Sequence, residues 1–289
     1  MINLMGAVGG IMVLGMVALL APDKANINYW PLFLGTAGVM VVGVIILKLT
    51  VNEPAEVIKM RHNSATLGID VEEAEHDDTL VTHERLPKEY RKSLIFILLS
   101  VALWFMGYNA VTSAFSKYAM VSLNMQESQS ASILMVASIA AIISFIPVGI
   151  LSSRIGRKKM ILVGVVVLAT VFGTSAFYTG FNPLLFVSFA LAGIAWAAIN
   201  VNSLPMVLEM SKGANIGRYT GYYYTASMAA QVITPIISGA LLEHLGYHTL
   251  MPYGALFVGL AFLTMMMVNH GDSKPIIGPS KLELFDVAD

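Results

Sequence analysis

The chain has 289 residues, of which 56% are hydrophobic and 12% charged, and its formal net charge is −1 at pH 7. Because soluble domains carry about 25% charged residues, these proportions exclude a soluble globular fold and predict that the lipid bilayer is the main partner of the chain. The near-zero net charge argues against nucleic acid as a partner. The absence of cysteine excludes disulfides and cysteine-based catalysis or metal binding.

Eight apolar segments are long enough to cross a bilayer as helices, which requires about 20 residues each. None of these segments contains Asp, Glu or Arg. In chain order they are residues 2–21, 28–48, 93–116, 131–152, 160–180, 183–207, 219–242 and 249–269. The sequence therefore predicts an all-α, polytopic helical membrane protein with about eight transmembrane helices.

A long polar stretch, residues 49–92, separates the second and third of these segments. It contains charged runs such as "VEEAEHDD" and few apolar residues, which is typical of a solvated linker. Its acidic residues and histidines, Glu75 to Asp78 with His83, are of types that bind metals, but we interpret them as a solvated charge run and expect no metal and no cofactor. The predicted domains are a helix pair, a cytoplasmic linker, a six-helix bundle and a cytoplasmic tail: 1–48, 49–92, 93–270 and 271–289.

Lysine and arginine are distributed unevenly between the two sides that the predicted helices define. The segments after the second, fourth and sixth helices, together with the C-terminal tail, hold 15 of the 17 cationic residues, while the other side holds Lys24 and Lys117. Positively charged short loops stay in the cytoplasm. Both ends of the chain are therefore predicted to be cytoplasmic, in a multi-pass protein of the cell membrane.

The segment "GILSSRIGRKKM", residues 149–160, joins the fourth and fifth predicted helices and carries four cations within six positions. Its pattern, G-x-x-x-S-R-x-G-R-K-K, resembles the inner-loop motif of the major facilitator superfamily, G-x-x-x-D-R-x-G-R-R/K. Ser153 stands where the motif has an acid, which weakens any charge-assisted contact to a neighbouring helix end. The resemblance implies a gating loop at the cytoplasmic face, formed by Gly149, Arg154, Gly156, Arg157 and Lys158.

The motif recurs between helices 2 and 3 and between helices 8 and 9 of the twelve-helix members of this superfamily. If this loop is the second copy, the eight predicted helices correspond to helices 5 to 12 and residues 49–92 join the two six-helix bundles. We therefore expect an N-terminally truncated major facilitator fold, a fragment whose partners include the missing N-terminal helices. The stretches "FMGYNAVTSAFSKYA", "AGIAWAAINVNSLPMVLEM" and "IGRYTGYYYTASMAAQVITPIISG" further resemble the glycoside/sucrose–proton symporter branch.

Polar side chains inside the apolar segments are the candidate site residues, because they are costly in a bilayer and tend to be functional. Amides exchange hydrogen bonds with hydroxyl groups, and an aromatic face packs against sugar C–H groups. The segments lack the arginine that an anionic solute would require. We predict that a small neutral solute, a sugar, is bound by Asn109, Ser113, Trp196, Asn200 and Gln231. The alternative is that these groups only join helices to one another.

The resemblance implies secondary active transport of a neutral solute, a sugar or glycoside, with a coupling proton or cation, by alternating access. The predicted helices within 93–269 offer no carboxylate or histidine to carry a proton, so the coupling groups are expected in the missing part. Motifs such as H-E-x-x-H and G-x-S-x-G are absent, and no enzyme activity is expected. Two alternatives remain open: a non-transporting membrane binding or assembly protein derived from a transporter, and efflux of hydrophobic compounds.

Overall fold

The computed structural model describes residues 30–50, 88–210 and 216–272. The regular structure of these residues is entirely helical, and six of the helices are long and apolar enough to cross a membrane. This confirms the prediction of an all-α, polytopic helical membrane protein. The first predicted helix, 2–21, lies outside the described residues, as do most of the linker and of the C-terminal tail.

The chain divides into two units, Met1–Glu84 and Arg85–Asp289. In the first unit the described part is helix α2, Trp30–Thr50, which matches the predicted second apolar segment. Its large apolar side chains, including Phe33 and Met40, are exposed on all sides of the helix. A helix that is apolar all round must be covered by lipid or by other protein segments.

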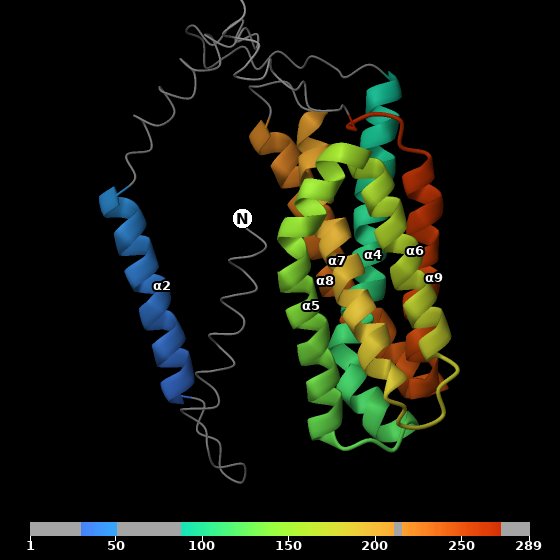
Figure 1. Cartoon of the computed structure of the whole chain (residues 1–289). Helices are drawn as coiled ribbons and strands as arrows, with labels where there is room; N and C mark the ends of the chain where they lie inside the picture. The colour runs from blue at the N-terminus through green and yellow to red at the C-terminus, as the bar shows by residue number, and fades with distance from the viewer. Residues whose placement is uncertain (1–29, 51–87, 211–215, 273–289) are drawn as a thin grey trace, which may run out of the picture. The chain divides into compact units, whose positions relative to one another are not determined.

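The described residues of the second unit form a bundle of six long helices (Figure 1). Helix α7 packs between α5 and α6, α9 packs between α6 and α4, and α4 packs between α9 and α8. A single 3-10 turn, η2, Tyr247–Thr249, precedes the last helix. The six helices are α4, Lys88–Ser122; α5, Glu127–Ile155; α6, Arg157–Ser175; α7, Leu184–Glu209; α8, Ile216–Leu245; and α9, Leu250–Met266.

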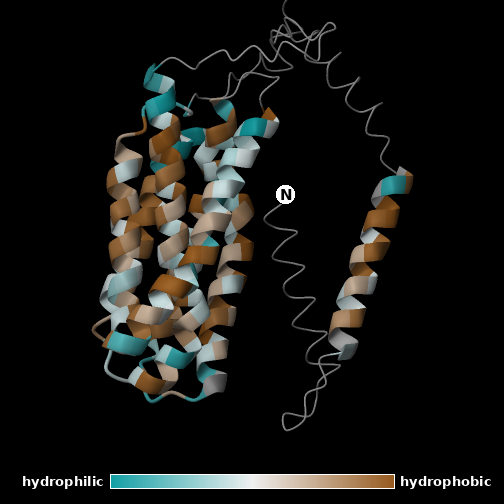
Figure 2. Ribbon diagram, turned by 180° about the vertical axis from the view of Figure 1, so that it is seen from behind, coloured by the Kyte–Doolittle hydropathy of each residue, from teal (hydrophilic) through white to brown (hydrophobic). Residues whose placement is uncertain are grey.

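Apolar side chains occupy both the core and the outer surface of the bundle. Trp104, Phe115 and Phe172 are among the largest fully buried side chains, while Ile143 and Val232 are each 68% exposed. Hydrophobic residues extend along the sides of the helices, and hydrophilic residues gather at their ends (Figure 2). This distribution is expected of helices whose sides face hydrocarbon and whose ends face water.

Small residues allow the helix backbones to approach closely at three places. A Cβ atom on Gly193 of α7 would lie 2.0 Å from the carbonyl oxygen of Ala137 on α5, and one on Gly164 of α6 would lie 2.8 Å from that of Ala195 on α7. At Gly107 of α4, a Cβ would lie 2.8 Å from a carbonyl oxygen of α9. Such small-residue contacts are the usual means by which membrane helices associate.

Several helix boundaries differ from the prediction by three to six residues, and two of them are instructive. Helix α4 begins at Lys88, five residues before the expected start, so the "KEYRK" run belongs to the helix and not to the linker. Its 35 residues extend about 52 Å at 1.5 Å per residue, well beyond a hydrocarbon core of about 30 Å. Helix α6 ends at Ser175 and not near residue 180. Hydropathy predicts the part of a helix that lies in lipid, but it does not predict where a helix ends once it continues into water.

Candidate functional site

Two aromatic rings from different helices form the centre of the candidate solute site. The rings of Tyr108 on α4 and Trp196 on α7 stack with centroids 3.6 Å apart and an interplanar angle of 3°. Phe105, one turn earlier on α4, meets Trp196 edge to face at 5.2 Å. The predicted residue Trp196 is therefore half-buried in an aromatic cluster, whose other members were not among the predicted site residues.

The predicted amides Asn109 and Asn200 lie on the same two helices, one and four positions after the stacked residues. The Nδ2 atom of Asn200 donates to the carbonyl oxygen of Trp196, one turn away, at 3.1 Å. The Nδ2 atom of Asn109, which follows Tyr108 in the chain, is buried and has no hydrogen-bond partner among the described residues. Ser113 is exposed and donates to the carbonyl oxygen of Asn109 at 2.6 Å. An unsatisfied buried amide is costly, so the Asn109 side chain is the group in this region that most needs a partner.

Gln231 on α8 is the one predicted site residue that the structure does not join to the others. Its Nε2 atom lies 3.6 Å from the sulfur of Met228 on the same helix, and no hydrogen bond joins it to described residues of α4 or α7. Helix α8 is fixed to α7 at another point, where the hydroxyl groups of Ser203 and Tyr223 form a buried hydrogen bond of 2.8 Å.

A cavity of about 280 Å³ lies on another side of Tyr108. It is lined by residues from four helices, is partly open, and shares only Tyr108 with the aromatic stack. Its lining is Tyr108, Val111, Thr112, Leu134, Ala137, Ser138, Phe172, Phe189 and Ala192.

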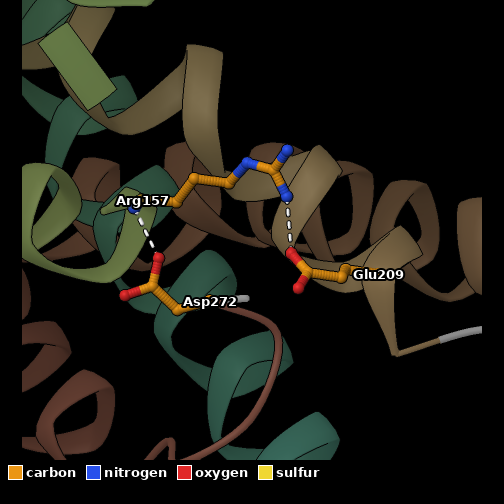
Figure 3. A network of polar contacts seen from close by, with 3 residues as sticks. All are labelled: Arg157, Glu209 and Asp272. Carbon is orange, nitrogen blue, oxygen red and sulfur yellow. Dashed lines mark hydrogen bonds and ion pairs between the residues drawn. The ribbon is translucent and has the colours of Figure 1, made fainter. Parts of the chain in front are cut away.

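At the cytoplasmic loop predicted from the motif, three charged residues form a network (Figure 3). The guanidinium of Arg157 donates to a carboxylate oxygen of Glu209, at the end of α7, at 2.5 Å. The backbone N–H of Arg157 donates to Oδ1 of Asp272, beyond α9, at 2.6 Å. The Nζ atom of Lys158 donates to the carbonyl oxygens of Met266 and Val268 at 3.2 and 2.5 Å. The loop is thereby connected to the ends of both α7 and α9.

The two motif glycines differ in what they contribute. Gly156 has φ +101°, a conformation that favours glycine, and a Cβ there would lie 3.0 Å from the Asp272 carboxylate. A Cβ on Gly149 would lie 3.7 Å from Val201, which is ordinary van der Waals contact. The tight turn therefore requires Gly156, whereas close approach at Gly149 does not require a glycine. Arg154, the remaining motif residue, is exposed on the last turn of α5.

The sequence analysis missed Asp272 as a site residue. Helix α6 has no side-chain cap from Gly156, its own N-cap residue, and the Asp272 carboxylate bonds to its first N–H from a segment 115 positions along the chain. Ser153, at the position where the motif carries an acid, donates instead to the carbonyl oxygen of Ile150 on its own helix. The contact between Asp272 and the Arg157 N–H depends on the path of the chain after α9, and no local sequence pattern predicts that path.

Comparisons with known proteins agree with this architecture. The profile of the Major Facilitator Superfamily matches residues 97–283, more than half of the chain. An uncharacterised MFS-type transporter of Schizosaccharomyces pombe is 25% identical over 196 residues, which are 64% of this chain and 43% of that protein.

Two solved structures share the fold. The human organic anion transporter MFSD10 (TETRAN) has a TM-score of 0.53 at 13% identity, over 64% of this chain and 49% of that one. The proton:xylose symporter XylE, bound to 6-bromo-6-deoxy-D-glucose, has a TM-score of 0.50 at 16% identity, over 63% of this chain and 45% of that one.

The six-helix bundle, with its apolar outer surface and the charged loop between α5 and α6, defines a polytopic helical membrane protein. The chain belongs to the Major Facilitator Superfamily. It spans less than half the length of the relatives described above.

Proposed function

We propose that the chain contributes the C-terminal bundle of a secondary active transporter that moves a neutral, polyhydroxylated solute, a sugar or glycoside, across the cell membrane. The solute moves with a proton or cation by alternating access. In this proposal, residues 49–92 connect the bundle to an N-terminal bundle that includes residues 1–48, and both ends of the chain are cytoplasmic. Rocking of the two bundles would expose a site near the midplane to each side in turn.

The observations that support a sugar-like solute are the aromatic stack and the unsatisfied amide at the next position of α4. The rings of Tyr108 and Trp196 present a flat apolar surface, and the Nδ2 atom of Asn109 is a donor without a partner among the described residues. Sugars offer apolar C–H faces and hydroxyl oxygens that accept hydrogen bonds. Within the described helices, no cationic group lies near this stack that would favour an anion.

Proton coupling is assigned to groups outside the described bundle interior. Among the described residues, Glu209 and Glu243 lie at or near helix ends, and Glu209 is paired with Arg157. A membrane-embedded carboxylate or histidine normally carries a coupled proton. The coupling group would therefore lie in the N-terminal bundle.

A direct test is the binding of methyl glucoside to the purified chain in lipid nanodiscs, measured by calorimetry. Replacing Trp196 by Ala removes half of the stack, and we expect about a 2- to 13-fold loss of affinity, because a stacked ring contributes about 0.5–1.5 kcal/mol. Replacing the exposed Trp30 of α2 by Ala is the matched control and should leave affinity unchanged. Equal affinities for the Trp196 variant and the parent chain would contradict the proposal.

The rival function with a specific observation in its favour is efflux of hydrophobic compounds, because the cavity beside Tyr108 is mainly apolar. Competition between sucrose and a hydrophobic dye for the full-length protein separates the two functions. Displacement of the dye by sucrose supports sugar transport, and dye binding that sucrose leaves unchanged supports efflux.

A further inference from the structure

The cavity beside Tyr108 is large enough for a ligand group. Its volume of about 280 Å³ is nearly twice that of a cavity of about 150 Å³, which is known to hold a benzene molecule in a protein core. The cavity is partly open, and its lining residues come from four helices, so a ligand group could enter it from the bundle surface.

The wall of the cavity offers a ligand a mainly apolar surface. Six of the nine lining residues are Val, Leu, Ala or Phe. The two aliphatic hydroxyls, Thr112 and Ser138, donate their hydrogens to carbonyl oxygens one turn back on their own helices, Tyr108 and Leu134, at 3.0 and 2.9 Å. A polar ligand group would lose its hydration here without gaining a donor from either of these two hydroxyls, which is unfavourable.

The cavity adjoins the proposed solute site through one residue. Tyr108 stacks on Trp196 and also lines the cavity, so a ligand group in the cavity and a ring held at the stack would be in contact with the same tyrosine. Ser138 is exposed and also lines the cavity, so the cavity reaches the bundle surface on its α5 side.

We infer that this cavity is a second compartment of the solute site and binds an apolar group about the size of a phenyl ring. The inference rests on the proposed function and deepens it: the solute is an amphiphilic glycoside that carries an alkyl or aryl substituent, and not a free sugar. The hydroxylated ring occupies the region of the stack and the Asn109 amide. The substituent fills the space between Val111, Leu134 and Phe189.

The experiment is a calorimetric titration of the chain in lipid nanodiscs with methyl, propyl, butyl and phenyl glucosides, with empty nanodiscs as the blank. Burial of one methylene group raises affinity about 4-fold, so butyl glucoside should bind about 60-fold more tightly than methyl glucoside. The phenyl compound should gain at least as much. The heat capacity change of binding should become more negative along the series, because more apolar area is buried.

Two variants link the gain to the cavity. Ser138→Phe places a ring at the open side of the cavity from an exposed position, where folding is not at risk, and should abolish the gain while leaving the affinity for methyl glucoside within 2-fold. Ala131→Phe adds the same ring at an exposed position of α5 that does not line the cavity, and should keep the full gain.

The outcomes separate the two proposals. If methyl glucoside binds and the series is flat, the cavity compartment is wrong and the sugar site stands. If only the phenyl compound binds and Ser138→Phe abolishes that binding, the cavity stands and the sugar site is wrong. Absence of binding for all four compounds overturns both.

Discussion

Removing the carboxylate of Asp272 is expected to loosen the turn between α5 and α6. This carboxylate accepts a hydrogen bond of 2.6 Å from the Arg157 N–H, and α6 has no side-chain cap from its own N-cap residue. Loss of an N-cap side chain costs about 0.5–2 kcal/mol, and hydrogen bonds to an ionised acceptor are the stronger ones. We therefore expect Asp272→Ala to lower the local stability of the turn by about 1–2 kcal/mol.

The neighbouring ion pair between Arg157 and Glu209 should contribute less to the stability of the turn than Asp272 does. The side chains of Arg157 and Glu209 are 34% and 21% exposed, so water partly screens their attraction. Exposed pairs contribute about 0.2–1 kcal/mol, and we expect Glu209→Gln to cost no more than about 1 kcal/mol. Because both acids contact Arg157, the double variant should depart from additivity.

The chain has no cysteine, so one introduced thiol reports local opening without background. Ser152, 6% exposed at the end of α5, is the reporter position as Ser152→Cys. A loss of 1–2 kcal/mol should speed maleimide labelling of this thiol about 5- to 30-fold when Asp272 is replaced. Ser175→Cys, buried at the far end of α6, should label at an unchanged rate. A rise of less than 2-fold at position 152, or an equal rise at position 175, would refute the reasoning.

Three further predictions concern the same bundle. Gly193→Ala should destabilise the bundle by about 1–3 kcal/mol, because the new Cβ meets the Ala137 carbonyl oxygen. The unfolding temperature in detergent should fall accordingly. Gly239→Ala is the control and should have little effect, because a Cβ there has nothing within 4 Å. Gly156→Ala should cost about 1–3 kcal/mol through its φ of +101° and raise labelling at the position 152 reporter, and an unchanged rate would contradict the required turn. A single cysteine at Arg154 should react with an impermeant maleimide in inside-out vesicles only, and labelling of intact cells would overturn the orientation.

The helices could be predicted from the sequence because a bilayer demands about 20 consecutive apolar residues, a signal that needs no knowledge of tertiary contacts. The start of α4 could not, since residues such as Lys88 and Arg91 continue the helix into water, where hydropathy carries no information. The glycine of the tight turn was found at Gly156 because its motif position fixes an unusual backbone conformation.

The candidate site was predictable within one helix and not between helices. Trp196 and Asn200 are four positions apart, a spacing that brings two residues to the same face of a helix, and a hydrogen bond joins them. The partner ring, Tyr108, lies 88 positions away on α4, and its stacking depends on how α4 packs against its neighbours. Asp272 likewise acts on α6 from the end of α9, so only the tertiary structure brings it into the network.

The close approach of α4 and α9 affects the aromatic stack indirectly, through the position of α4. Gly107 meets the α9 backbone near Gly254, while the next residue, Tyr108, meets Trp196 on α7. Successive residues of a helix point about 100° apart, so Gly107 and Tyr108 face different neighbours. Because they are adjacent in one helix, the position of α4 along the α9 axis also determines the position of the Tyr108 ring along Trp196. A bulkier side chain on α9 at its contact with Gly107 would shift α4, and with it the Tyr108 ring relative to Trp196. At the proposed solute site, substitutions on α9 would therefore change affinity without altering any residue that is proposed to contact the solute.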